Sequence, residues 1–387
     1  MKLTKLFRDF FNDNKSGGIL LIVCTIISMV LSNSSFSDTY IKFWETDFNG
    51  HTITHWINDG LMAIFFLLIG LELEREIYKG ELSILKKAMF PIFSALGGVL
   101  IPAAIYLIFN FGTYTQNGAG IPMATDIAFA IGILSLLGSK VPASLKIFLT
   151  ALAVIDDLCA IIVIAIFYTD DISFYYLALS LSIFVVLLIM NRLKIRNLLP
   201  YLIGGVAMWY FMLHSGVHAT ISGVLLAFAI PFGKGDAKSS SYILQHFLHK
   251  PVAFIIVPLF ALANTCIVFG TNWTNGLISR EGIGIIAGLV AGKPIGILLF
   301  SSIAVFTGIC TLPEGLNWKH IMGAALLGGI GFTMSIFITL IAFDNNVNIE
   351  KAKIAIIFSS LIAALVGLIV LNFVLRKNPV ENKIPDQ

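Results

Sequence analysis

The sequence has little charge for its length of 387 residues: 12% of its residues are Asp, Glu, Lys or Arg, whereas 57% are hydrophobic. A soluble globular chain has about 25% charged and about 45–50% apolar residues. Both departures exclude an ordinary soluble protein and favour a helical protein that crosses a membrane many times. The sequence also has no basic block with interleaved aromatic residues, so we expect no nucleic-acid partner.

Several marks of enzymes and exported proteins are also scarce. The four cysteines form no Cys-x-x-Cys pair, which favours buried thiols over disulfides or a metal site. A nucleotide-binding Gly-x₄-Gly-Lys-[Ser/Thr] loop is absent, because Gly292-Lys293 is followed by Pro294. No Ala-x-Ala pattern follows the first apolar run, so we expect a retained first helix rather than a cleaved signal peptide. We expect no cofactor and no enzymatic activity.

Long apolar runs dominate what remains, and they predict an all-α integral membrane protein of about 12 spans in one domain over 1–387. Basic residues fall mainly in the segments that share a side with the N-terminus, so we expect both termini in the cytoplasm. The expected spans are roughly 17–33, 56–73, 88–109, 118–137, 145–168, 173–190, 198–213, 217–231, 251–269, 282–306, 320–343 and 354–375.

Two adjacent carboxylates, Asp156 and Asp157, lie near the middle of the run 147–168, which carries no other charge. A charged Asp at that depth costs about 2.5–3.5 kcal/mol in insertion experiments. Such groups are retained where they face water, an ion or a counter-charge. The pair therefore indicates an ion or proton pathway, and carboxylate oxygens suit the hard cations Na⁺ and Li⁺ as well as a proton.

Two of the apolar spans are interrupted at mid-depth. In the first, Pro122 disfavours a continuous helix, and Thr125 and Asp126 follow it and can cap freed amides. The second contains glycines at 328, 329 and 331 and no charge. These spans are the fourth and the eleventh, so they cross the membrane in opposite directions. Matching interrupted helices of opposite orientation predict inverted repeats, about 88–168 and 282–375, whose broken ends meet at the midplane.

The broken ends need counter-charges. We expect Asp126 to balance the positive helix N-termini and Lys293, alone in the uncharged stretch 282–306, to balance the negative C-termini. Lys293 also needs a partner at that depth, and either Asp156 or Asp157 serves.

A mid-membrane site that holds either a proton or a hard cation is sufficient for exchange of cytoplasmic Na⁺ against external H⁺ by alternating access. Two titratable carboxylates favour more than one proton per cation, which makes transport electrogenic. The alternatives are a structural salt-bridge network, a cation channel and an intramembrane aspartyl protease, whose Gly-x-Gly-Asp motif is absent.

Two further features lie outside the interrupted spans. Asn49-Gly50 predicts a small extracytoplasmic β-hairpin over 46–54, and the edges of this hairpin can pair with a second subunit. The alternative is that the segment is a plain turn. Glu72 and Glu76 share a helix face at a cytoplasmic span end. They form either a solvated cluster or an acidic mouth that gathers cations.

Seven short motifs follow one another along nearly the whole chain. They are Trp56-Ile57-Asn58-Asp59, Gly70-Leu71-Glu72, Ala124-Thr125-Asp126-Ile127-Ala128-Phe129-Ala130, Ile155-Asp156-Asp157-Leu158, His214-Ser215-Gly216-Val217-His218-Ala219-Thr220, Gly292-Lys293-Pro294-Ile295-Gly296 and Gly329-Ile330-Gly331-Phe332-Thr333-Met334-Ser335. Together these motifs resemble the NhaA-type bacterial Na⁺/H⁺ antiporters. Broken-helix inverted repeats are known from this family itself, so the repeat pattern and the resemblance are not independent.

The resemblance implies an inner-membrane homodimer joined partly through the hairpin, with a role in pH and sodium homeostasis. It implies that Asp157 binds the cation while Asp156 pairs with Lys293, with Thr125 nearby. It also implies a cytoplasmic funnel at Glu72 and Glu76, and a histidine linked to the pH response at His218.

One stretch departs from the family pattern. The pH-sensing region of the family commonly has a basic pair and a glutamate, whereas here Gln245 stands in place of the glutamate within Tyr242-Ile243-Leu244-Gln245-His246. Glutamine does not titrate, so we expect a shifted or flatter pH activation profile.

Overall fold

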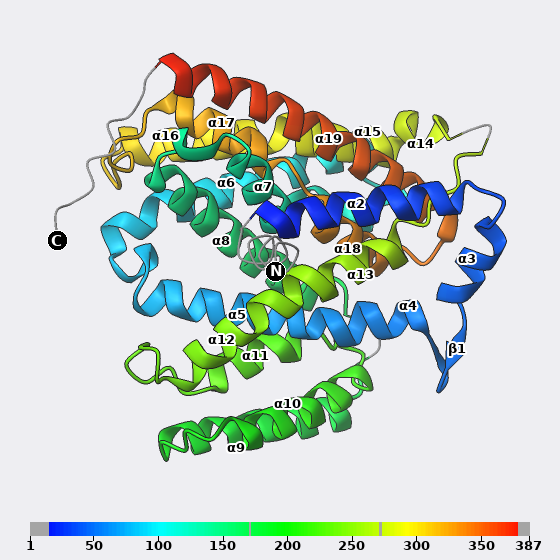
Figure 1. The fold of residues 1–387 in the computed structure, drawn as a ribbon, viewed down its shortest axis with the longest axis vertical. Coiled ribbons are helices and arrows are strands. Elements are labelled where there is room, and N and C mark those ends of the chain that lie inside the picture. The colour runs from blue at the N-terminus through cyan, green and yellow to red at the C-terminus, as the bar shows by residue number, and fades with distance from the viewer. Residues whose placement is uncertain (1–14, 170–171, 271–272, 378–387) are drawn as a thin grey trace, which may run out of the picture. The chain divides into compact units, whose positions relative to one another are not determined.

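The computed structural model describes residues 15–169, 172–270 and 273–377, and this part of the chain is helical apart from one short hairpin (Figure 1). It forms two compact units. Unit 1 holds the described residues of Met1–Ile19, Ile84–Asp157 and Phe269–Gln387, and unit 2 those of Leu20–Ser83 and Leu158–Val268. The boundary falls inside α8, between Asp157 and Leu158.

Eight helices of the described chain are long and apolar enough to cross a membrane, or up to ten if each of two bent helix pairs counts as one span. The bent pairs are Ser16–Ser32 with Ser37–Trp44, and Trp318–Gly328 with Phe332–Ala342. The expected spans 198–213 and 217–231 appear as helices of 16 and 9 residues, shorter than the roughly 20 residues that a straight span needs. The predicted all-α membrane architecture is confirmed.

Unit 1 contains both interrupted stretches. Its elements are α6 (Leu85–Asn110), η3 (Gln116–Met123), α7 (Ile127–Ser135), η4 (Gly138–Lys140), the first part of α8 (Ala143–Phe167), α14 (Asn275–Ile278), α15 (Arg280–Ile286), η6 (Ala287–Gly292), α16 (Lys293–Phe306), α17 (Trp318–Gly328), α18 (Phe332–Ala342) and α19 (Asn346–Lys377).

Unit 2 contains the hairpin and the remaining helices, among which α9 and α10 run side by side (Figure 1). Its elements are most of α2 (Lys15–Ser32), α3 (Ser37–Trp44), β1 (Asp47–Phe48), β2 (His51–Thr52), α4 (Ile53–His55), η1 (Trp56–Leu61), α5 (Met62–Tyr78), η2 (Glu81–Ser83), the end of α8, α9 (Phe174–Arg192), α10 (Leu198–Leu213), α11 (Ile221–Ala229), α12 (Ser240–Pro251), η5 (Val252–Ile256) and α13 (Val257–Asn264).

The hairpin has the turn that its sequence predicts. Asn49 and Gly50 have φ angles of 58° and 85°, as a two-residue type I′ turn requires. Strands β1 and β2 pair antiparallel, with Asp47 opposite Thr52, and Figure 1 shows the hairpin between α3 and α4. The predicted two-stranded hairpin is thus confirmed.

Helices α6 and α16 cross closely in unit 1, at a pair of glycines. A Cβ atom added at Gly97 would lie 2.0 Å from the carbonyl oxygen of Gly296, and one added at Gly296 would lie 2.0 Å from the carbonyl oxygen of Gly97. Small residues allow backbones to approach in this way, and dispersion then stabilises the helix pair. The crossing fixes α16, which carries Lys293 at its first position.

Proline explains the π-helical segment that leads into Lys293. Pro294 has no backbone N–H, so the helix from Arg280 to Phe306 cannot keep its regular bonding there. The chain widens into the π segment η6 over Ala287–Gly292 before α16 begins. Such local widenings are frequent at functional sites.

Candidate functional site

The first interrupted stretch runs through η3 and α7. Segment η3 ends at Met123, Ala124 is extended (φ −80°, ψ 150°), and Asp126 is the N-cap of α7 (φ −79°, ψ 96°). Pro122 lies in the last turn of η3, where its missing N–H favours a break. The Asp126 carboxylate Oδ1 accepts a hydrogen bond from the Phe129 amide at 2.9 Å, so α7 is capped by its own sequence.

The second interrupted stretch lies between α17 and α18, which bend by 45° at the break. Gly329, Ile330 and Gly331 separate the two helices. The N-cap of α18 is Gly331, which has no side chain to accept from the first amides of the helix. These amides therefore need acceptors from elsewhere in the protein.

Asp126 supplies one of those acceptors and so lies at the N-termini of both α7 and α18. Its Oδ2 accepts from the Thr333 amide at 3.0 Å and also from the Thr333 hydroxyl. The Asp126 amide donates to the Ile330 carbonyl at 2.7 Å, which joins the two breaks directly. One carboxylate thus faces two positive helix ends at a position that is only 2% exposed.

The carbonyl ends of the interrupted stretches are satisfied by different groups. The Lys293 ammonium donates to the Met123 carbonyl at the end of η3. The carbonyl of Gly328, at the end of α17, instead accepts from the Thr125 hydroxyl at 2.8 Å. The sequence predicted Lys293 at both C-termini, whereas the recorded contacts place its ammonium at the first of them.

The carboxylate pair comes from the middle of α8. Asp156, Asp157 and Lys293 are all fully buried. Asp156 Oδ2 lies 2.8 Å from the Lys293 ammonium and accepts from the Thr125 hydroxyl at 2.7 Å. The ion pair that the sequence left open between two aspartates is therefore made by Asp156.

The geometry leaves acceptor capacity for a cation. Asp156 Oδ1 is buried and accepts no hydrogen bond from any residue that the structure describes. Two ionised carboxylates and one ammonium carry a net negative charge, and an uncompensated buried charge is costly. A proton or a hard cation with oxygen ligands balances such a charge. Thr125, Asp126, Asp156, Asp157 and Lys293 thus fit the site for a transported ion, which would be a substrate and not a resident metal.

The remaining predicted residues belong to unit 2. Glu72 and Glu76 are both partly exposed on α5, and Glu76 Oε2 accepts from the Glu81 amide at 3.1 Å. The His218 Nε2 atom lies 2.7 Å from the carbonyl oxygen of Tyr168.

Around Gln245 the structure supplies a basic group that the local sequence lacks. The guanidinium of Arg75, from α5, lies 5.6 Å from the ring centroid of Tyr242. Tyr242 in turn stacks on His246 with ring centroids 6.1 Å apart. A cationic side chain from another helix therefore lies beside Tyr242, three positions before Gln245.

Sequence reasoning assigned no role to three hydroxyl residues of the site. Thr333 donates to Asp126, Ser335 donates to the carbonyl of Ile121 at 2.7 Å, and Ser360 accepts from the amide of Phe332 at 3.1 Å. Thr333 and Ser335 lie in one of the motifs that carry the family resemblance, but hydroxyls carry no charge and do not stand out in an apolar run. Ser360 lies in α19, and no sequence signal links it to the breaks.

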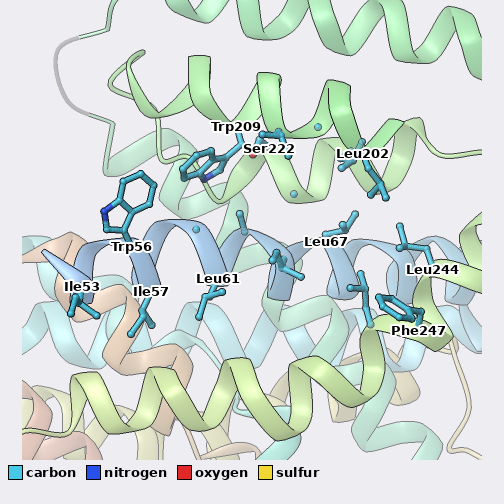
Figure 2. Close-up of a pocket in the computed structure, with 18 of the residues that line it drawn as sticks. Ile53, Trp56, Ile57, Leu61, Leu67, Leu202, Trp209, Ser222, Leu244 and Phe247 are labelled. Atoms are coloured by element: carbon cyan, nitrogen blue, oxygen red, sulfur yellow. The ribbon is translucent and has the colours of Figure 1, made fainter. Parts of the chain in front are cut away.

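Unit 2 also contains a large cavity of about 790 Å³, formed along η1 and α5 with α10, α11 and α12 (Figure 2). Figure 2 shows Trp56, Leu67, Trp209 and Phe247 among the apolar side chains that line it. Its lining residues, all within the described chain, include no acidic or basic side chain. The cavity is therefore unsuited to bind a bare cation.

Interrupted helices that meet beside a buried carboxylate pair are typical of secondary transporters, whose ion sites lie near the membrane midplane. The structure of a sodium proton antiporter from Methanocaldococcus jannaschii is similar at a TM-score of 0.54 and 14% identity, over 95% of this chain and 93% of that one. At that identity the similarity concerns the fold alone.

Sequence comparison gives the family. The family described as Na⁺/H⁺ antiporter 1 matches residues 8–371. A Na⁺/H⁺ antiporter NhaA 1 of Flavobacterium johnsoniae is 67% identical over 98% of this chain and 99% of its own length. A Na⁺/H⁺ antiporter NhaA of Flavobacterium psychrophilum is 63% identical over 99% of this chain and 100% of its own length. The chain belongs to the NhaA family of Na⁺/H⁺ antiporters, as the motifs in its sequence predicted.

Proposed function

We propose that this protein exchanges cytoplasmic Na⁺, and Li⁺, for external H⁺ at the Asp156–Asp157 pair by alternating access. The observation that carries the proposal is the fully buried carboxylate pair of α8 beside the meeting point of two interrupted helices. Relatives at 67% and 63% identity bear the name Na⁺/H⁺ antiporter. Exchange follows if a proton and a sodium ion compete for the same oxygens.

Each residue of the site has a part in this competition in the proposal. Asp157 is the cation ligand. The adjacent residue, Asp156, has an oxygen, Oδ1, that accepts no hydrogen bond from the described residues and is available as a second ligand. Lys293 holds Asp156 through the ion pair, while Thr125 fixes the other side of the same carboxylate oxygen. Loss of a proton from the pair exposes negative charge that Na⁺ then neutralises.

More than one proton is exchanged per cation in this proposal, because two titratable carboxylates and a lysine lie together. Transport is then electrogenic and its rate depends on membrane potential. Measurement of exchange at several potassium diffusion potentials in proteoliposomes tests this point. Rates that are equal at all potentials would contradict it.

The protein works in this proposal in a bacterial inner membrane, with both termini in the cytoplasm, and contributes to pH and sodium homeostasis. The stretches 88–168 and 282–375 are its inverted repeats, within a single transport domain. Glu72 and Glu76 form an acidic cytoplasmic mouth that raises the local cation concentration. The partly exposed position of Glu76 supports that role.

A homodimer joined partly through the 46–54 hairpin completes the proposal. The hairpin leaves strand edges that can pair with another chain, and Phe48 at its tip is 69% exposed. Cysteine cross-linking at Phe48 in native membranes tests this contact. A product of dimer size supports the dimer, and its absence under conditions that cross-link an established dimer would contradict the hairpin contact.

The pH response is proposed to involve His218 and to be flatter than is usual for the family because Gln245 does not titrate. Exchange rates of wild type and Gln245→Glu are compared across a pH series. We expect a steeper alkaline activation in Gln245→Glu. Equal steepness in the two proteins would contradict the role of this position.

The central test is sodium-driven proton movement in everted membrane vesicles. Wild type is expected to dissipate a preset pH gradient when Na⁺ or Li⁺ is added, and Asp157→Asn is expected not to. Asp344→Asn is a matched control, because Asp344 is exposed between α18 and α19. It removes one carboxylate charge without touching the buried pair.

The outcomes separate the alternatives. A response in wild type and Asp344→Asn but not in Asp157→Asn supports both the antiporter and its ion ligand. Sodium flux without any coupled proton movement would indicate a channel instead. A full response from Asp157→Asn would show that the cation binds elsewhere.

A further inference from the structure

The hydroxyl of Ser360 lies at the second break although it comes from α19, a helix that contains no break. Its Oγ accepts a hydrogen bond from the Phe332 amide at 3.1 Å, and both groups are buried. Phe332 is the first residue of α18, and the N-cap Gly331 offers no side-chain acceptor. Ser360 therefore caps α18 from outside, next to the cap that Asp126 gives to Thr333.

Several hydrogen bonds hold the second break, and Ser360 differs from the other partners in the helix that it comes from. The Gly328 carbonyl is held by Thr125, the Ile330 carbonyl by the Asp126 amide, and the Thr333 amide by the Asp126 carboxylate. These partners all belong to the first interrupted stretch. Among the hydrogen bonds recorded for the described residues, the Ser360 bond is the one that ties residues 328–333 to α19.

This arrangement matters because hydrogen bonds join the two breaks. Thr125, which holds Gly328, also donates to Asp156, so a displacement of the break reaches the carboxylate that pairs with Lys293. A buried amide that loses its acceptor is destabilised, and the next amide of α18, that of Thr333, is bonded to Asp126. The position of the α18 N-terminus thus affects the electrostatics of the ion site.

We propose that Ser360 is a positioning residue for ion exchange, which holds the first peptide of α18 so that its N-terminus stays directed at Asp126. This role rests on the proposed function, because it concerns the affinity of the same site for Na⁺ and H⁺. Ser360 does not contact the ion. It acts through Phe332, Thr333 and Asp126.

The neighbouring serine provides a matched control. Ser359 is as buried as Ser360, at 0% and 2% exposure. Its hydroxyl donates within its own helix, to the carbonyls of Ala355 at 2.7 Å and Ile356 at 3.0 Å. Ser359→Ala thus removes the same atoms from the same helix without uncapping α18.

The experiment measures apparent KM for Na⁺, maximal exchange rate and pH profile in everted vesicles for Ser360→Ala, Ser360→Thr and Ser359→Ala. We expect Ser360→Ala to raise the apparent KM about tenfold, the factor set by one buried hydrogen bond, and to shift the pH profile. The maximal rate is expected to stay within about twofold of wild type. Ser360→Thr keeps the acceptor oxygen and Ser359→Ala keeps the cap, so both should resemble wild type.

A second measurement does not depend on transport. Amide hydrogen exchange of peptides that cover 329–334 is expected to be faster in Ser360→Ala than in wild type and unchanged in Ser359→Ala. If Ser360→Ala does not fold, Ser360→Cys carries both measurements, because a thiol of similar size is a poor acceptor.

The proposal is overturned if Ser360→Ala keeps the wild-type KM and pH profile, or if Ser359→Ala shifts them equally. It is also overturned if exchange of the 329–334 peptides is unchanged by loss of the Ser360 hydroxyl. Failure of wild type to exchange Na⁺ for H⁺, with faster amide exchange in Ser360→Ala, would instead contradict the proposed function and leave the cap in place.

Discussion

The two interrupted stretches of unit 1 differ in how their helix ends are stabilised. The first has a proline, a capping carboxylate and a threonine within 122–126, so α7 begins on its own Asp126. The second has glycines and Ile330 at the break, and α18 begins on acceptors from Asp126 and from Ser360 of α19. The carbonyl ends differ as well, since a lysine serves Met123 and a hydroxyl serves Gly328.

This difference shows which part of the chain encodes the conformation of each break. The first stretch has its polar groups in the local sequence and remains recognisable alone. The second is flexible by composition and acquires its conformation from groups that the fold brings to it. A glycine-rich break also leaves room for close approach, since a Cβ at Gly329 would lie 2.5 Å from the carbonyl oxygen of Leu289.

The largest expected effect comes from the carbonyl end of the first stretch. Lys293→Met removes the donor to Met123 and leaves Asp156 as a buried charge without its partner. Breaking a buried ion pair from one side costs about 3–5 kcal/mol. We expect a large fall in the thermal unfolding midpoint of the purified protein in detergent.

The control for this prediction is the double variant Lys293→Met with Asp156→Asn. It removes both charges, so its midpoint should lie closer to wild type than that of the single variant. A double variant less stable than Lys293→Met alone would contradict the ion-pair explanation.

An intermediate effect is expected at the amide ends, where one carboxylate caps both stretches. Asp126→Ala removes two caps, each worth about 0.5–2 kcal/mol, and should accelerate amide exchange in peptides 127–131 and 331–335 alike. Asp126→Asn keeps one acceptor oxygen and should protect one of the two peptides. If Asp126→Ala affected only the first stretch, the shared cap would be disproved.

The smallest effects are expected from single hydroxyls that join the stretches. Thr125→Val removes a hydroxyl whose one proton is shared between Asp156 and the Gly328 carbonyl, so two buried acceptors lose their donor, whereas Ser335→Ala takes the donor from one acceptor, the Ile121 carbonyl. At about 0.5–1.5 kcal/mol for each hydrogen bond, Thr125→Val should be the more destabilising of the two. Thermal unfolding measured side by side checks this order, and the reverse order would mean that Thr125 is not a joint between the breaks.

Much of the fold and part of the site could be predicted from the sequence. The hairpin follows from Asn49-Gly50, because few other dipeptides adopt two positive φ angles without strain. Asp126, Asp156, Asp157 and Lys293 stand out because isolated charges are costly in apolar runs. The hydroxyls of Thr333, Ser335 and Ser360 cost little in such runs, so no comparable signal marked them.

The order of residues along the chain is enough to predict the membrane class, the places where two spans break, and the charged groups that those breaks require. These features depend on properties of single residues and short runs, namely hydropathy, the missing N–H of proline and the cost of burying a charge. The folded chain is needed to show that Asp156 pairs with Lys293, that one carboxylate caps two helices, and that Ser360 reaches α18. Those pairings join residues as much as 207 positions apart in the chain, and hydrogen-bond geometry in the folded state selects among partners that local sequence treats as equal.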